Sequence, residues 1–401
     1  MSIPCHLADH PVAVSNGDSS LFRHHTPMRI LHTESSLGMG GQEYRVLQEA
    51  QGMEKRGHRV VVAAPHGSQL AILAEQRGLQ VKTTSSGNRG WIALVPSYLR
   101  ILKQDEIDVV NTHGSLDSWT ASIAGRISSR RPIIVRTRHK STPVLPTWRH
   151  RLLYGSLPHV VTTTGEAVRQ GLITRNRLSP SRVISIPTGV DLERFHPQAP
   201  DAFLRKSLGL GSQGPLVGAV TFLRPEKGMD VLIEAVRWLK KRFSTLECVI
   251  IGDGGEKAAL SDRIRVLGLE HSVHLVGFRQ DVPALLAILD VVVIPSFEEG
   301  IPQSLTQALA MERPVVASAV GGVPEVVQDG VSGLLVPPRD PVILAEKIAC
   351  LLHDPMAATC MGKVGRQVIQ ERYSMEQMLT QTEMVYRRLM HSESSVTMSG
   401  C

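Results

Sequence analysis

The sequence predicts an α/β protein built on parallel sheets, and three observations support this prediction. Short apolar runs such as Arg59–Ala64 and Val291–Ile294 have the composition of strands that are buried on both faces. Stretches with helical periodicity separate them, as in Gln303–Met311. Polar or glycine-containing loops follow the strands, as at Glu298–Gly300. In such sheets ligands bind beyond the carboxyl ends of the strands, so these loops are the first place to look for a site.

The first half of the chain alternates strands and helices. Residues 1–27 lack periodicity and are expected to be a disordered tail, or to precede a true start at Met28. A strand follows from Met28, and a loop that contains Gly38, Gly40 and Gly41 leads into a helix. Later strands are expected at 59–64, 79–83, 108–111, 159–164 and 182–186, with helices at 68–77, 91–103, after residue 114 and from Gly165.

The second half repeats the alternation after a connection rich in Pro and Gly. Strands are expected at 216–221, 246–251, 273–276, 291–294, 314–317 and 334–336, and helices between them and over 340–391. We therefore predict a domain at 28–190, a linker at 191–214, a domain at 215–372, a helix at 373–391 and a flexible tail at 392–401. Two or three domains also suit a chain of 401 residues.

Composition narrows the class of partner. The net charge of +7 favours anionic partners such as nucleotides, phosphorylated lipids or a membrane surface. Aromatic residues make up only 4% of the chain, which argues against nucleic acid, because single-strand binders need stacking faces. The five scattered cysteines lack metal or redox spacing and indicate reduced thiols, hence a cytoplasmic protein. No apolar run reaches the roughly 18 residues that a membrane span needs.

Several polar residues stand at expected strand ends. His113 follows one strand, although a lone histidine is as readily a satisfied core residue. Arg224 and Lys227 follow the first strand of the second half, where they are suited to neutralise a diphosphate, and an ordinary surface loop would hold them too. Glu299 and Gln307 are eight positions apart and fit one site, or else a solvated loop and helix surface.

A basic segment runs from Arg126 to Arg151, with no acidic residue between Asp117 and Glu166. Aromatic and apolar residues such as Trp148 interrupt it and give it an amphipathic character. Such a segment can lie on anionic lipid, and a solvated basic face is the alternative. Its candidate membrane or acceptor contacts are Arg136, Arg138, Lys140, Arg149 and Arg151.

These pieces, in this order, resemble the retaining, nucleotide-sugar-dependent glycosyltransferases of family 4 (glycosyl transferase group 1), which have the GT-B fold of two Rossmann-like domains facing across a cleft. The resemblance covers residues 28–391. It is carried by the motifs GMGGQE (38–43), NTHGS (111–115), IPTGVDLERF (186–195), LRPEKGMDVLIEA (223–235), IGDGGE (251–256), VGF (276–278), SFEEGIPQSLTQALA (296–310) and VGGVPEVV (320–327).

The resemblance implies roles for particular residues. Gly40 and Gly41 would lie against the phosphate–sugar region of the donor, which His113 would also reach. Lys227 would bind the diphosphate and Glu299 the hydroxyls of the donor sugar. Further donor-binding positions would be Gly252, Phe278 beside the base, Gly300, Ile301, Pro302, Gln303, Ser304 and, at the ribose, Gln307.

Two positions depart from the family pattern. Gln307 stands where the family usually has Glu, which keeps an acceptor for a ribose hydroxyl but loses the charge. Phe222 stands where an arginine is common, and we expect Arg224 to take part of that role. No Asp-x-Asp motif is present, in keeping with the metal-independent enzymes of the family, so we expect no metal and no cofactor.

The sequence thus predicts a cytoplasmic enzyme, peripheral on the membrane, that moves a sugar from a UDP- or GDP-sugar to a lipid-linked or cell-envelope saccharide, with retention of the anomer. Two rival enzymes are an inverting GT-B transferase and one with a soluble acceptor. A rival of another class is a non-catalytic nucleotide-sugar-binding protein, which Gln307 suggests.

Overall fold

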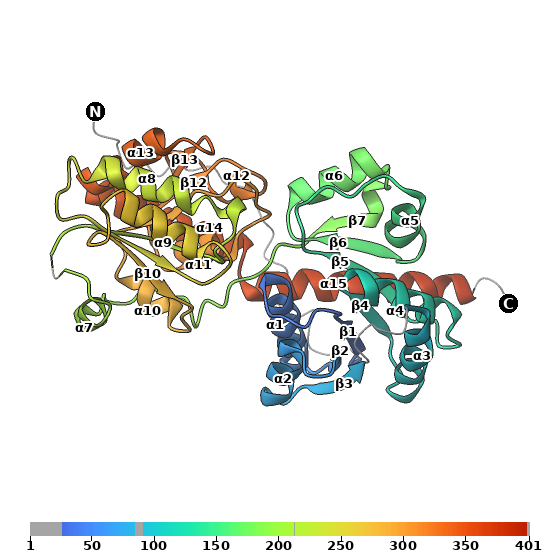
Figure 1. Ribbon diagram of the computed structural model, residues 1–401. Helices are drawn as coiled ribbons and strands as arrows, with labels where there is room; N and C mark the ends of the chain where they lie inside the picture. Colours follow the sequence, from blue (N-terminus) through green and yellow to red (C-terminus); the bar gives the residue numbers. More distant parts are fainter. Residues whose placement is uncertain (1–25, 85–90, 212, 399–401) are drawn as a thin grey trace. The chain divides into compact units, whose positions relative to one another are not determined.

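The computed structural model describes residues 26–84, 91–211 and 213–398 (Figure 1). They form two compact units. The N-terminal unit holds residues 26–164, 168–186 and 378–398, and the C-terminal unit holds 165–167 and 187–377. Almost all of the expected tail at 1–27 lies outside the described residues.

The N-terminal unit is built on a parallel sheet of seven strands in the order β3-β2-β1-β4-β5-β6-β7. Its strands are β1 (Arg29–Thr33), β2 (Arg59–Pro65), β3 (Gln80–Thr84), β4 (Val109–Thr112), β5 (Ile133–Arg138), β6 (Val160–Thr163) and β7 (Val183–Ser185). Its helices are α1 (Gly41–Lys55), α2 (Gln69–Gln76), α3 (Val95–Gln104), α4 (Ser115–Ile127), α5 (Trp148–Arg151) and α6 (Glu166–Asn176), with a π-helical turn η3 (Leu152–Ser156).

The C-terminal unit repeats this plan with six parallel strands in the order β10-β9-β8-β11-β12-β13. Its strands are β8 (Leu216–Val220), β9 (Glu247–Ile251), β10 (Val273–Gly277), β11 (Val291–Ile294), β12 (Val315–Ser318) and β13 (Leu334–Val336). Its helices are α7 (Ala202–Ser207), α8 (Met229–Leu239), α9 (Lys257–Val266), α10 (Val282–Ala287), α11 (Gln303–Ala310), α12 (Val323–Val326), α13 (Pro341–His353) and α14 (Pro355–Arg372).

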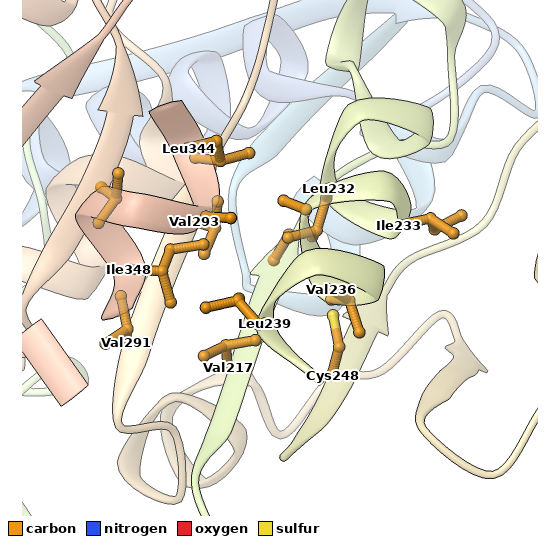
Figure 2. Packing of buried hydrophobic residues seen from close by; sticks show 14 of the residues in the cluster. Val217, Leu232, Ile233, Val236, Leu239, Cys248, Val291, Val293, Leu344 and Ile348 are labelled. Atoms are coloured by element: carbon orange, nitrogen blue, oxygen red, sulfur yellow. The ribbon is translucent and has the colours of Figure 1, made fainter. Parts of the chain in front are cut away.

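Packing of α8 and α13 on the second sheet makes the core of the C-terminal unit (Figure 2). Leu232 of α8 and Ile348 of α13 are fully buried against Val217, Val291 and Val293 of the central strands. Each such side chain contributes about 1.5–3 kcal/mol by leaving water. This core holds the two central strands in register, and their carboxyl ends carry the loops described below.

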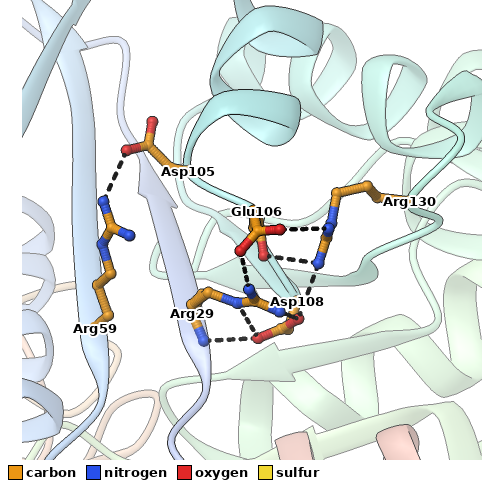
Figure 3. Close-up of polar contacts among 6 residues, drawn as sticks. All are labelled: Arg29, Arg59, Asp105, Glu106, Asp108 and Arg130. Atoms are coloured by element: carbon orange, nitrogen blue, oxygen red, sulfur yellow. Dashed lines mark hydrogen bonds and ion pairs between the residues drawn. The ribbon is translucent and has the colours of Figure 1, made fainter.

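An ion-pair network closes the amino-terminal edge of the first sheet (Figure 3). Arg29, at the start of β1, bonds to Asp108 just before β4 and to Glu106, and Arg130 bonds to the same Glu106. The carboxyl edge, where parallel sheets bind ligands, takes no part in this network.

The α/β prediction and the GT-B fold class are confirmed, and most elements lie close to their expected places. The last helix, α15 (Met375–Met398), is longer than expected, since a flexible tail was foreseen from residue 392. From Met378 onward it belongs to the N-terminal unit. Within the expected linker at 191–214, residues 202–207 form α7.

Candidate functional site

In both sheets the strand order reverses beside the first strand, between β1 and β4 and between β8 and β11. The crossover helices leave in opposite directions at this point, so a crevice opens beyond the carboxyl ends of the strands, where ligands of such folds bind. Sequence-predicted residues lie at both switch points: Gly40, Gly41 and His113 in the N-terminal unit, and Lys227 and Glu299 in the C-terminal unit.

In the C-terminal unit the two principal predicted residues meet. Lys227 follows β8 and Glu299 follows β11, and Lys227 Nζ lies 2.6 Å from Glu299 Oε1. The Ser296 hydroxyl donates to the same oxygen at 2.8 Å. The Lys227 side chain is 21% exposed and that of Glu299 9%, so the pair is shielded but open on one side. A charged amine and an acceptor carboxylate therefore stand together at the switch point.

Two glycines bring these loops so close. Gly228, next to Lys227, has φ of 66°, and a Cβ there would lie 2.1 Å from the carbonyl oxygen of Pro295. Gly321, in the loop after β12, has φ of 53°, and a Cβ would lie 1.8 Å from the carbonyl oxygen of Glu299. Only glycine fits such backbone contacts at positive φ. The glycine loop seen in the sequence therefore supports the backbone of Glu299.

The other predicted donor-side residues lie around this pair without joining it. Arg224 is 65% exposed in its side chain and stacks on Phe222, with its Cζ 5.7 Å from the ring centroid. Phe278 is 60% exposed. Gln307 is half-buried on α11. Gly252 follows β9, and the loop from Glu299 into α11 contains Gly300, Ile301, Pro302, Gln303 and Ser304.

In the N-terminal unit a buried carboxyl group holds the glycine-containing loop. The amides of Ser35 and Ser36 donate to Glu34 Oε1 (2.8 and 3.0 Å), and Gln42 of α1 donates to Oε2. Gly40 caps α1, and Gly41 is its first residue. Burial, and then the nearby charge of Asp117, raise the pKa of Glu34 to about 7. A group that titrates near neutral pH thus ties both ends of this loop.

Asp117 orders the adjoining loop after β4. Its Oδ2 accepts from the Thr33 hydroxyl (2.7 Å) and from the amides of His113 and Gly114 (3.1 and 3.2 Å), and Oδ1 accepts from the Ser35 hydroxyl (3.0 Å). The ends of β1 and β4 are therefore fixed to each other, and His113 has a defined backbone position.

His113 is the middle ring of three. Its Nε2 lies 3.0 Å from Nδ1 of His32 on β1, and its Nδ1 lies 2.9 Å from Nε2 of His139 after β5. Sequence reasoning singled out His113 but missed His32 and His139. Their signal was present, because alternate residues at the ends of neighbouring parallel strands point to the same face.

Below this chain the same face of the sheet carries a second buried polar group. Asn111 Nδ2 donates to Tyr386 Oη of α15 (2.8 Å) and to Glu49 Oε1 of α1 (3.2 Å), and Tyr386 donates to the same Oε1 (3.0 Å). Arg45, also fully buried, donates to the carbonyl oxygen of Ile186 (2.7 Å). The C-terminal helix is thus bonded to the strand that ends at His113.

The basic segment differs from the amphipathic surface that we expected. Its middle is strand β5, and Arg136 is only 3% exposed and donates to the carbonyl oxygens of Thr112 and Thr137 (3.2 Å each). The prediction that Arg136 contacts a membrane or acceptor is therefore wrong. Arg138 is half-buried and donates to Tyr154 Oη (3.0 Å). The exposed basic residues of the segment that we had predicted are Lys140, Arg149 and Arg151.

Within the described ranges, no three His, Cys, Asp or Glu side chains converge as a metal site would require. Over the same ranges no helix combines the length and the apolar character needed to cross a bilayer.

Comparison with known proteins gives two family matches. Residues 201–368 match the model described as "Glycosyl transferases group 1", and residues 39–194 match "Glycosyltransferase Family 4". Together the matches span most of the chain. The first contains the Lys227–Glu299 pair, and the second contains the histidine chain from His113 to His139.

Individual relatives agree with these matches. The D-inositol 3-phosphate glycosyltransferase of Salinispora arenicola is 37% identical over 49% of this chain and 47% of its own length. A GDP-mannose-dependent alpha-(1-6)-phosphatidylinositol monomannoside mannosyltransferase of Mycolicibacterium smegmatis is 33% identical over 61% of this chain and 66% of its own length. The chain spans about half the length of the curated relatives that it matches first.

A solved structure has the same fold. The Anabaena protein HepE, crystallised with UDP-glucose, superposes with a TM-score of 0.78 at 24% identity, over 91% of this chain and all of that one. At this identity the likeness establishes the fold.

Proposed function

Since the chain belongs to the glycosyltransferases of group 1 (family 4), we propose that it moves a sugar from a nucleotide-diphosphate sugar to a saccharide acceptor. The observation that carries the proposal is the Lys227–Glu299 pair at the switch point of the C-terminal sheet. It joins a cation suited to phosphate with an acceptor suited to sugar hydroxyls, within hydrogen-bond distance of each other.

On this proposal the donor exchanges partners within the pair. Lys227 turns from Glu299 to the diphosphate, and Glu299 then accepts hydrogen bonds from hydroxyls of the donor sugar. Arg224 is exposed and stacked on Phe222, and it swings toward the diphosphate as a second cation. Gln307 accepts a ribose hydroxyl through its amide oxygen, with a weaker bond than a carboxylate would make.

The chemistry requires stabilisation of a leaving diphosphate. Cleavage of the sugar–phosphate bond leaves negative charge on the diphosphate while the sugar becomes oxocarbenium-like. Lys227 stabilises that charge in a partly shielded place, and we propose that it does so without a divalent ion. We propose retention of the anomer and assign no protein nucleophile, with the acceptor attacking on the face that the diphosphate leaves.

UDP- and GDP-sugars are the proposed donors. HepE was crystallised with UDP-glucose, and the mycobacterial relative is named for GDP-mannose. A thermal-shift screen with UDP-, GDP- and ADP-sugars tests this, and we expect stabilisation by a UDP- or GDP-sugar. Loss of the shift in Lys227→Ala, but not in Lys257→Ala, supports the site, since Lys257 pairs with Asp253 on α9 and serves as a matched control. A shift that survives Lys227→Ala contradicts it.

For the acceptor we propose a lipid-linked or cell-envelope saccharide, as in lipopolysaccharide or exopolysaccharide synthesis, reached from the cytoplasmic side of a membrane. The support is an exposed cluster of Lys140, Arg149 and Arg151 with Leu145 (65% exposed) and Trp148 (70% exposed). Cationic and aromatic side chains together suit an anionic lipid surface.

Co-sedimentation with vesicles of phosphatidylcholine, with and without phosphatidylglycerol, tests the membrane proposal. We expect binding only with the anionic lipid, and loss of binding when Lys140, Arg149 and Arg151 are replaced by Ala. The control replaces exposed Lys206, Arg265 and Lys363, which removes the same charge elsewhere. Equal binding by the two triple variants would refute the surface.

A second candidate is a non-catalytic nucleotide-sugar-binding protein, favoured by Gln307 in place of the family's usual Glu. Tight donor binding without transfer or hydrolysis across the panel would select it. Determination of the product anomer separates retaining from inverting transfer, and simple soluble acceptors test whether a lipid is needed.

A further inference from the structure

Both ring nitrogens of His113 are engaged by other histidines. The His32 and His113 ring centroids are 5.3 Å apart with 22° between the planes, and those of His113 and His139 are 5.2 Å apart with 36°. With nitrogen–nitrogen distances of 3.0 and 2.9 Å, the three rings form a hydrogen-bonded chain. In this arrangement the His113 ring has no nitrogen left for a sugar.

The chain is neutral, which limits its proton arrangements. Burial, and then His139 and His32, lower the pKa of His113 well below its usual value. Burial, and then Arg45, Arg136 and Arg138, do the same to the pKa of His139, and burial lowers that of His32. Each ring then carries one proton, so every ring is protonated either on Nε2 or on Nδ1.

Glu49 decides between these two arrangements. Its Oε1 lies 4.0 Å from Nε2 of His32, and both side chains are fully buried. A carboxylate oxygen attracts an N–H and repels a ring lone pair at this distance. His32 therefore carries its proton on Nε2, and its Nδ1 accepts from His113 Nε2. His113 Nδ1 in turn accepts from His139 Nε2, which leaves a lone pair on Nδ1 of His139.

That last nitrogen is the open end of the chain. Among the residues that the structure describes, none donates to or accepts from Nδ1 of His139. The ring follows β5 at the carboxyl edge of the sheet, and the residue is partly exposed, whereas His113 is only 1% exposed. A hydrogen-bond acceptor of fixed orientation thus stands where a ligand of this sheet would bind.

We propose that His139 is a substrate-binding residue whose Nδ1 accepts a hydrogen bond from a sugar hydroxyl, and that His32 and Glu49 are positioning residues acting through His113. This inference rests on the proposed function, because that function supplies the saccharide. The hydroxyl belongs to the donor sugar or to the acceptor, and separate kinetic measurements distinguish the two.

Nitrogen-15 NMR of histidine-labelled protein tests the proton arrangement without any substrate. We expect His32, His113 and His139 all as the Nε2–H tautomer, assigned through single His→Gln variants. Glu49→Gln, which removes the selecting charge, should let the Nδ1–H form of His139 appear. A proton on Nδ1 of His139 in the wild type would overturn the proposal.

Two substitutions at His139 separate substrate binding from structure. His139→Gln places an amide near the Nε2 position and keeps the bond to His113, but it lacks the acceptor at Nδ1. His139→Asn places an amide oxygen near Nδ1. We expect Gln to raise one KM about tenfold, the loss of one hydrogen bond, and Asn to restore most of it.

The kinetic measurements use hydrolysis of UDP-glucose and GDP-mannose for the donor KM and transfer to methyl glycosides for the acceptor KM. A change confined to one KM identifies which sugar His139 binds. Values within twofold of the wild type for both substrates, in both variants, would overturn the inference. Should the wild type bind no nucleotide sugar, the proposed function fails, and the tautomer measurement still decides the acceptor at His139.

Discussion

Replacing Glu34 with Gln should make the stability of the N-terminal unit less dependent on pH. Glu34 is 1% exposed, and its pKa is about 7 in the folded protein against an ordinary value of 4.5. Because the folded-state pKa is raised, the contribution of Glu34 to stability is complete below pH 4.5 and is lost as the pH rises through 7. Gln keeps an amide oxygen for the amides of Ser35 and Ser36 and never ionises.

The magnitude follows from the two pKa values. One pKa unit corresponds to about 1.4 kcal/mol. Between about pH 5.5 and about pH 8.5 the shift from 4.5 to 7 makes wild-type unfolding easier by about 2 kcal/mol, relative to a side chain that does not titrate. The free energy of unfolding of Glu34→Gln, minus that of the wild type, should therefore rise by about 2 kcal/mol over this range.

Urea unfolding followed by tryptophan fluorescence measures this difference. Three of the four tryptophans lie in the N-terminal half, so a Trp238→Phe background reports on that unit alone. The buried histidines have lowered pKa values and destabilise the protein below about pH 6.5, but they do so equally in both proteins and cancel in the difference. A difference that stays constant across the pH range would refute the raised pKa of Glu34.

Two further substitutions test the packing around the sites. Tyr386→Phe removes the hydroxyl that bonds Glu49 and Asn111, and leaving these buried groups short of partners should cost about 2–3 kcal/mol of stability. A comparable loss in the half-exposed Tyr44→Phe would contradict this. Gly321→Ala drives a Cβ into the carbonyl oxygen of Glu299 and should weaken nucleotide-sugar binding at least tenfold. Gly330→Ala has a similar φ of 75° with nothing within 4 Å, so it pays only the backbone cost, about 1 kcal/mol; equal binding by the two variants would show that the contact is unimportant.

The sequence predicted the layout well because period and turn chemistry are local properties. Val291–Ile294 reads as a buried strand and Gln303–Ala310 as a helix from their residues alone, and the structure has both. The pairing of Lys227 with Glu299 could be anticipated, because loops after parallel strands gather at one edge. Their 2.6 Å contact depends on Gly228 and Gly321, whose role appears only when the loops are seen together.

Other features depend on distant parts of the chain and were not predictable. The basic run around Arg136 suggests a surface, but β5 lies between β4 and β6 and is buried, so its arginine bonds to backbone carbonyls. The histidine chain needs the order of β1, β4 and β5 in the sheet, which local periodicity does not give. The bond between Asn111 and Tyr386 joins residues 275 positions apart.

The central claim is that Lys227 takes up the charge of the leaving diphosphate without a divalent ion. The direct measurement is turnover of the donor identified in the thermal-shift screen, with and without EDTA, for the wild type, Lys227→Ala and Lys257→Ala. We expect a loss of about 10²–10³ in kcat for Lys227→Ala alone, and no effect of EDTA on the wild type. Full turnover by Lys227→Ala, or inactivation of the wild type by EDTA, would contradict the account.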